Sequence, residues 1–210
     1  MSNKKEEVDW YHCEKKLRNK GYKTICGVDE AGRGPLAGPV CAAAVVLPEY
    51  FPIELRDIND SKKLTPKKRE ELYSKIVKTA LDYRVEFIFE KTIDEINILN
   101  ATMLCMKKAV ENLKIRPDFA LIDGNKSPDL GSMSSFSIVK GDSLSASIAA
   151  ASILAKVSRD RYMIKISEKY PHYNFYKNKG YGTMDHIMKI KECGVCEIHR
   201  LSFLRKIRGI

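Results

Sequence analysis

The alternation of apolar and polar positions along the chain predicts strands and helices in a mixed order. Short apolar, β-branched or aromatic runs bounded by turn residues predict strands at residues 22–28, 40–47, 84–89, 119–122 and 135–139. Apolar residues at helical spacing predict helices over residues 5–20, 65–83, 92–113 and 144–166. We therefore expect a mixed α/β layer fold, followed by a looser helical segment.

Local signals mark several helix starts and one connection. Thr65 followed by Pro66 is typical of an N-cap and a first helical position, and the TIDE sequence at residues 92–95 matches a capping box. Small residues between positions 145 and 155 would let the backbone of the last long helix press against a sheet. The loop rich in glycine and proline after residue 28 predicts a hairpin-like connection between the first two strands.

Length and composition indicate one globular domain. The chain has 210 residues, of which 44% are hydrophobic and 30% charged. Its longest apolar run, at residues 40–47, is far shorter than the roughly 20 residues that a membrane span needs. The first residues lack the apolar core of a signal peptide, so we expect a cytoplasmic protein.

Six cysteines fit a reducing compartment. Only Cys193 and Cys196, with His199 close behind, have the spacing of metal ligands. Because the chain has no second pair of this kind, we expect reduced thiols here rather than a zinc site.

The net charge of +10 is concentrated near the end of the chain. Residues 156–210 carry 13 Lys and Arg against 5 Asp and Glu. This asymmetry favours a polyanionic partner, nucleic acid first, although a merely solubilising surface would give the same composition. We expect the segment from about residue 167 to residue 210 to be a helical, substrate-binding appendage of the single domain.

Three of the predicted strands end in acidic residues, namely Asp29 with Glu30, Asp123 and Asp142. Carboxylates brought together at the ends of strands need a compensating cation, and Mg²⁺ or Mn²⁺ prefers oxygen ligands. Each acid also has a structural interpretation. Asp142 could cap the helix predicted at residue 144, and Asp123 could belong to a turn. Neighbours in a regular strand point to opposite faces, so Asp29 and Glu30 share a site only if the pleat is broken.

Two further segments carry candidate chemistry. Lys62, in the DSKKL sequence at residues 60–64, precedes a predicted helix start and could bind a phosphate, although a solvated loop is an equal alternative. Tyr181 lies between Gly180 and Gly182, which would leave its ring open for stacking on a sugar or base. Burial of the ring under a turn is the alternative.

Together these motifs resemble the ribonuclease HII family, the prokaryotic type 2 ribonucleases H. The GVDEAGRGPLAGPV sequence at residues 27–40 is similar to the family signature. The resemblance continues in order along nearly the whole chain, through residues 60–64, 93–97, 122–124, 140–142, 150–160, 179–183 and 199–203. The related ribonuclease HIII has an extra N-terminal domain. Only about 24 residues precede the first strand here, so the resemblance favours HII.

The resemblance implies a ribonuclease H-like mixed sheet flanked by helices. It also implies a monomeric endonuclease of DNA replication and repair. Such an enzyme cleaves the RNA strand of RNA–DNA hybrids, and duplex DNA at single embedded ribonucleotides, leaving 3′-hydroxyl and 5′-phosphate ends. Its cofactor would be Mn²⁺ or Mg²⁺, with two ions during catalysis. A catalytically silent module that binds RNA–DNA hybrids is the alternative from another functional class.

The resemblance also assigns roles to individual residues. Four carboxylates match the catalytic residues, and the first three of them would hold metal: Asp29, Glu30, Asp123 and Asp142. Three loop residues match the backbone reader of the ribose 2′-hydroxyl: Gly32, Arg33 and Gly34. Tyr181 matches the tyrosine that packs on the sugar, and Ser61 and Lys62 match phosphate-contacting positions.

Overall fold

The computed structural model describes residues 9–205 and has a five-stranded mixed sheet at its centre. The strand order is β3-β2-β1-β4-β5. β1 and β2 form an antiparallel hairpin, β3 is antiparallel to β2, and β4 and β5 run parallel to β1. The strands are β1 (Ile25–Ala31), β2 (Val40–Val46), β3 (Asp82–Ile88), β4 (Phe119–Asp123) and β5 (Ser134–Ile138).

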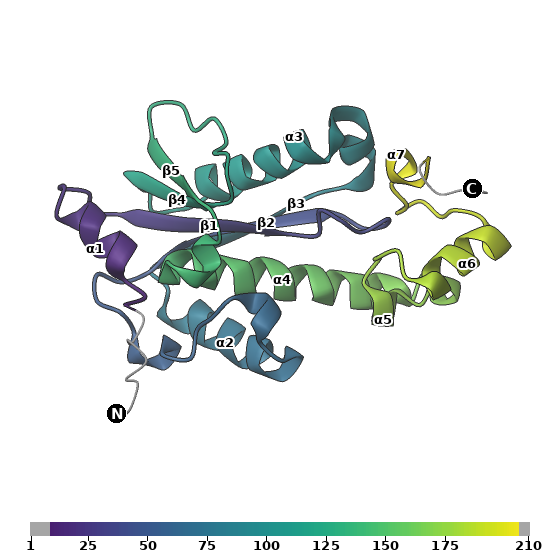
Figure 1. The fold of residues 1–210 in the computed structure, drawn as a ribbon, viewed down its shortest axis with the longest axis horizontal. Helices are drawn as coiled ribbons and strands as arrows, with labels where there is room; N and C mark the ends of the chain where they lie inside the picture. Colours follow the sequence, from purple (N-terminus) through teal and green to yellow (C-terminus); the bar gives the residue numbers. More distant parts are fainter. Residues whose placement is uncertain (1–8, 206–210) are drawn as a thin grey trace, which may run out of the picture.

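Helices cover both faces of the sheet, which confirms the predicted α/β layers (Figure 1). α3 (Glu90–Glu111) lies on one face, α4 (Ala146–Ser167) on the other, and α2 (Pro66–Thr79) packs outside α4. α1 (His12–Arg18) lies at one end of the sheet. None of the helices described has both the length and the apolar character needed to cross a bilayer.

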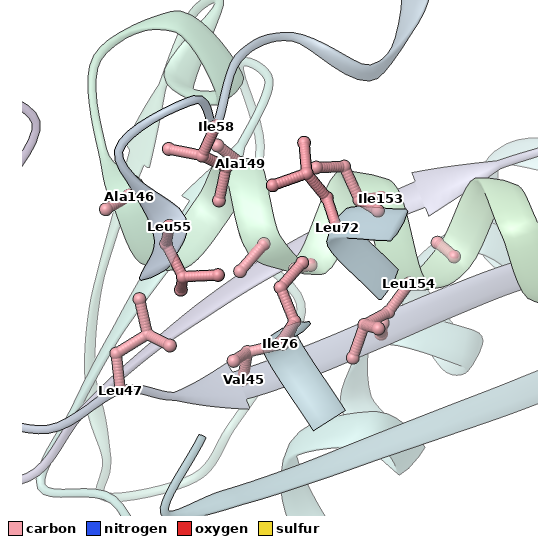
Figure 2. Packing of buried hydrophobic residues seen from close by; sticks show 14 of the residues in the cluster. Val45, Leu47, Leu55, Ile58, Leu72, Ile76, Ala146, Ala149, Ile153 and Leu154 are labelled. Atoms are coloured by element: carbon pink, nitrogen blue, oxygen red, sulfur yellow. The ribbon is translucent and has the colours of Figure 1, made fainter. Parts of the chain in front are cut away.

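Strand β2 is buried on both faces, as its uninterrupted apolar sequence requires. Alternate side chains, including Ala43 and Val45, join a cluster with apolar residues of α2 and α4, such as Ile76 and Ile153 (Figure 2). The intervening side chains, such as Val46, face α3 and join a second cluster. The sheet is therefore fixed between two apolar layers.

Helix α4 approaches β1 more closely than any side chain on Gly27 would permit. A Cβ atom built on Gly27 would lie 2.1 Å from the carbonyl carbon of Ser147. The helix begins where Ser145 Oγ accepts a hydrogen bond from the Ile148 N–H, so Ser145 is the N-cap. The alternative that Asp142 caps a helix starting at residue 144 is therefore wrong.

Several predicted boundaries differ from the structure. β1 runs through Ala31, so Asp29 and Glu30 lie inside the strand instead of closing it. The TIDE sequence is not a capping box, because α3 already begins at Glu90. The predicted start at Pro66 is confirmed, with Thr65 as its side-chain cap, although α2 ends at Thr79. Residues 5–8 of the first predicted helix lie outside the described residues, and α1 starts at His12.

The chain after α4 consists of short helices packed around a cluster of their own. These are the 3₁₀ turn Pro171–Tyr173, α5 (Phe175–Asn178), α6 (Met184–Cys193) and α7 (Leu201–Leu204). Three more 3₁₀ turns lie earlier in the chain, at Ile53–Leu55, Ser61–Lys63 and Gly141–Ser143. The cluster of the last segment includes Tyr173 and Phe175, and it also takes in Ala37 from the β1–β2 loop. This segment is therefore attached to the loop that follows the acidic pair.

We expect Gly27→Ala to destabilise the protein by about 1–3 kcal/mol or more, because an added methyl group must push α4 away from β1. Urea unfolding followed by circular dichroism measures the change. Gly34→Ala is the matched control, since a Cβ at Gly34 meets nothing closer than 3.9 Å. Equal unfolding free energies for the two variants would contradict the steric argument.

Candidate active site

The acidic site lies where two parallel strands separate. The β1–β4 ladder ends at the pair Val28 and Ile122, so Asp29 and Asp123 are the next residues on the two strands. One carboxylate oxygen from each of Asp29, Glu30 and Asp123 lies within 4.8 Å of the others. The structure thus brings together the three residues that the sequence proposes as metal ligands.

Asp29 and Glu30 meet without a break in the pleat. Their pairing with β2 stays regular, opposite Ala43 and Ala42. The Asp29 carboxylate turns toward the next residue of the strand, and its Oδ1 accepts a hydrogen bond of 2.6 Å from the Glu30 backbone N–H. Side-chain rotation therefore overcomes the alternation of faces that the regular strand imposes.

Asp142 lies beside this group of three acids, on the 3₁₀ turn Gly141–Ser143. The turn is tied to the site because Asp123 Oδ1 accepts a 2.7 Å hydrogen bond from the Gly141 N–H. The Asp142 side chain is buried, and Asp60 lies close enough to raise its pKa. The fourth predicted carboxylate thus lies near an acid for which the sequence predicted no role.

Burial and mutual repulsion make these acids hard to ionise. Burial, then the charges of Glu30 and Asp123, raise the pKa of Asp29 well above its usual value. Burial, then the charge of Asp123, raises the pKa of Glu30 against the opposing effect of Arg33. Burial, Asp60 and Asp123 raise the pKa of Asp142 to about 6. Such a cluster favours any cation that can enter it.

The donor set fits a divalent metal. All three grouped ligands are carboxylate oxygens, which hard cations such as Mg²⁺ and Mn²⁺ prefer. The exposed Lys62 also faces the cluster: burial opposes its charge, but Asp29 and Asp142 raise the pKa of its ammonium group overall. One ammonium cannot balance four clustered carboxylates.

Two buried arginines bind the loop after β1 through hydrogen bonds to its backbone carbonyls. Arg200 donates hydrogen bonds to the carbonyl oxygens of Gly32, Arg33 and Gly38 at 2.7–2.9 Å. Arg159 donates to the carbonyls of Ala37, Pro39 and Lys179 at 2.9–3.1 Å. Burial, and then Arg159, lower the pKa of Arg200 to about 9, which leaves it protonated at neutral pH.

Glycine is required at the first position of this loop. Gly32 has a φ of +94°, and a Cβ there would lie 2.0 Å from Arg159 Nε. Gly34 is exposed and open. The Arg33 side chain is also exposed, and its Nη1 lies 3.5 Å from Glu30 Oε1. The loop thus presents residues 33 and 34 outward beside the acids.

Tyr181 lies next to this loop with its ring in the open. The residue is 42% exposed, which excludes the alternative of a ring buried under a turn. The Arg159 guanidinium carbon is 5.9 Å from the centre of the ring, and a Cβ on Gly34 would be 3.9 Å from the ring edge. The tyrosine and the glycine loop therefore border the same surface.

Ser61 is not placed for direct contact with a phosphate. It is only 3% exposed, and its hydroxyl shares a 2.8 Å hydrogen bond with Ser152 Oγ. Ser152 in turn lies close enough to Asp29 to lower the pKa of that carboxylate against the larger effect of burial. Ser61 therefore contacts a neighbour of Asp29, and its predicted phosphate contact is not favoured.

Three residues of the site had no assigned role in the sequence analysis. Asp60, Arg159 and Arg200 each lie within a quoted motif, but nothing in the residue pattern gave their contacts. One signal was available for Arg159, which lies four residues from the buried Ala155 and four from the buried Met163 on α4. An arginine on the apolar stripe of a helix needs buried acceptors.

Removing one acid should stabilise the metal-free protein. The folded-state pKa of Asp142, about 6, exceeds its ordinary 3.8, so its contribution to stability is full below about pH 4 and is lost as the pH rises through about 6. We expect Asp142→Asn to raise the metal-free Tm at pH 7 by about 2–4 °C. Thermal scans in chelator measure this, with the exposed Asp129→Asn as control. A lower Tm for Asp142→Asn would contradict the repulsion.

Known proteins are similar to this chain in sequence and in fold. A family model described as Ribonuclease HII matches residues 26–206. The ribonuclease HII of Caldicellulosiruptor bescii is 59% identical over 205 residues, 98% of this chain and 98% of the relative. The crystal structure of ribonuclease H2 from Pyrococcus horikoshii OT3 has a TM-score of 0.71 and 32% identity, covering 86% of this chain and 93% of that one.

A more distant structure, Bst-RNase HIII in complex with Mn²⁺, shares the fold at 18% identity and a TM-score of 0.62, over 89% of this chain and 63% of that one. The sequence relatives extend over nearly the whole chain and are far above the level at which similarity shows a family. The chain therefore belongs to the ribonuclease HII family, nucleases of the ribonuclease H class that act on nucleic acid with a divalent metal.

Proposed function

We propose that this protein cleaves the RNA strand of RNA–DNA hybrids, and duplex DNA at single embedded ribonucleotides, at the site formed by Asp29, Glu30, Asp123 and Asp142. The observation that carries the proposal is the convergence of three carboxylates within 4.8 Å at the separation of β1 and β4, with Asp142 beside them. The products are a 3′-hydroxyl and a 5′-phosphate. Family membership supports the reaction class.

Asp29, Glu30 and Asp123 would hold the metal, which we propose to be Mg²⁺ or Mn²⁺, with two ions during catalysis. When bound, the metal supplies Lewis-acid activation of water and stabilisation of the leaving 3′-oxygen. The chain's own residues fix the geometry: the Gly141 N–H orients Asp123, and the Glu30 N–H orients Asp29. Lys62, which lies near the acids, would bind the phosphate.

The outward residues of the glycine loop would recognise the ribose. Arg200 holds the carbonyls of Gly32 and Arg33, and the next residue, the exposed Gly34, has no side chain to cover its backbone. The 2′-hydroxyl is the group that distinguishes the target sugar from deoxyribose. The open ring of Tyr181 would pack on that sugar beside the loop.

We extend the proposal to the segment at residues 167–210, which would bind the duplex through its basic side chains. Its attachment to the β1–β2 loop, through Ala37 and through the bond from the Arg200 N–H to the Leu36 carbonyl, supports this role. Phosphate binding of this kind reads no sequence and weakens with salt. A silent hybrid-binding module is not favoured, because relatives at 52–59% identity are named ribonucleases.

We expect Asp123→Asn to lower cleavage of a duplex carrying one ribonucleotide by about 100-fold or more, since losing a ligand costs at least as much as losing an outer partner of one. Gel analysis of the labelled strand with Mn²⁺ and with Mg²⁺ measures the rate. Asp129→Asn, an exposed acid in the β4–β5 loop, is the matched control. Equal rates for Asp123→Asn and wild type would remove that acid from the site.

We expect Gly34→Ala to weaken recognition of the ribose without changing the stability of the free protein. The added methyl group has open space in the free protein, so we expect the Tm to stay within about 2 °C of the wild-type value. In the complex the same group would stand between the loop and the sugar, and we expect kcat/KM to fall about tenfold or more. Wild-type kcat/KM on the single-ribonucleotide duplex would show that the loop backbone does not approach the ribose there.

A further inference from the structure

We infer that His186 and His199 are positioning residues that hold Tyr181 in place through a one-way chain of hydrogen bonds. The inference rests on the proposed function, because it concerns the tyrosine that would pack on the sugar. Neither histidine touches the acids, and both are almost fully buried. Hydrogen bonds nevertheless connect the two histidines to the backbone of Tyr181.

Each hydrogen bond fixes the direction of the next one. The Tyr181 carbonyl can only accept, so His186 Nδ1, at 2.9 Å, must carry the proton. The Nε2 atom of a neutral His186 is then an acceptor, and His199 Nε2, at 3.1 Å, donates to it. His199 Nδ1 is left as an acceptor and receives the backbone N–H of Cys196 at 2.9 Å.

The surroundings require both rings to be neutral. Aromatic rings of Tyr173 and Phe175 pack against the two imidazoles with centroid distances of 4.9–6.4 Å. Burial, then the proximity of His186, lower the pKa of His199 to about 4, and burial also lowers the pKa of His186. A second proton on His186 would set its Nε2–H against the Nε2–H of His199. The chain of bonds therefore has one arrangement near neutral pH.

Tyr181 needs such support because its ring is open to solvent on one side. The residue is 42% exposed and follows Gly180, whose φ is +83°. Its carbonyl also accepts from the Thr183 N–H, and Thr183 Oγ1 caps the helix turn that carries His186. The direction in which the ring leaves the backbone thus depends on how that carbonyl is held.

The chain of bonds also joins two segments that border the proposed substrate surface. His199 forms a bridge with Ala37 of the β1–β2 loop, and Gly38 N–H donates to the Ile198 carbonyl beside it. His186 belongs to α6, whose first turn follows Tyr181. The two histidines therefore set the tyrosine against the loop on which the proposed ribose recognition depends.

Two substitutions at His186 each keep half of the chain of bonds. His186→Asn places an amide N–H near the position of Nδ1 and can still donate to Tyr181, whereas it loses the contact with His199. His186→Gln places its amide near Nε2 and can still accept from His199, whereas it loses the donor to Tyr181. Both variants put a buried amide in the same cavity, so their Tm values should fall by similar amounts.

We expect His186→Gln to lower kcat/KM for the single-ribonucleotide duplex about tenfold, because the tyrosine is displaced, and His186→Asn to stay within about threefold of wild type. Exposed His172→Asn is the control for loss of a histidine in this segment. Equal losses in His186→Asn and His186→Gln at equal Tm would overturn the inference, since packing alone would then explain both.

A double-mutant cycle with Tyr181→Ala makes the test specific. If His186 acts through the tyrosine, His186→Gln should change kcat/KM less than about twofold in the Tyr181→Ala background. A full tenfold loss there would overturn the inference alone. Wild-type activity of Tyr181→Ala would overturn both this inference and the role proposed for the tyrosine. Absence of cleavage by the wild-type protein would instead defeat the proposed function.

Discussion

The contact between α4 and β1 determines where almost every part of the site lies. The helix can reach the strand only because Gly27 has no side chain, so the Ser147 backbone lies directly on it. From that position Ser152 reaches Asp29, and two turns further along Arg159 reaches the loop after β1. At the start of the helix, Ser147 binds the buried Glu14 of α1. The close contact between α4 and β1 thus fixes the positions of the acids, the loop after β1 and helix α1 relative to one another.

The site concentrates charge where the fold would otherwise avoid it. Asp29 and Asp123 follow the last paired residues of parallel strands, and neither can move away without disturbing that ladder. Neighbouring strands and helices are packed on both sides, so the repulsion cannot be relieved by expansion. The protein accepts a cost in stability at this point, and a divalent cation removes it. The repulsion between the clustered carboxylates therefore accounts both for the affinity for a metal and for the local loss of stability.

The layers, the five strands and the three converging acids could be predicted from the sequence, because apolar periodicity is a local property and the acids lie close to where apolar runs end. The sequence did not predict that β1 continues through Ala31, since the paired residues of β2 decide this. Nor could it show that the Asp29 carboxylate turns toward the Glu30 N–H, which is a choice of rotamer. The contacts of Arg159 and Arg200 with the loop after β1 join residues more than 100 positions apart and follow only from tertiary packing.

The two buried arginines have an electrostatic consequence for encounter with a polyanion. Their six hydrogen bonds all go to backbone carbonyls, so peptide dipoles solvate the guanidinium groups without cancelling their charge. Each guanidinium therefore contributes a positive charge to the loop from below its surface, with the buried Glu90 as the nearest acid common to both. Mobile counterions cannot pair with these buried guanidinium groups directly, so this contribution is less sensitive to salt than that of an exposed side chain.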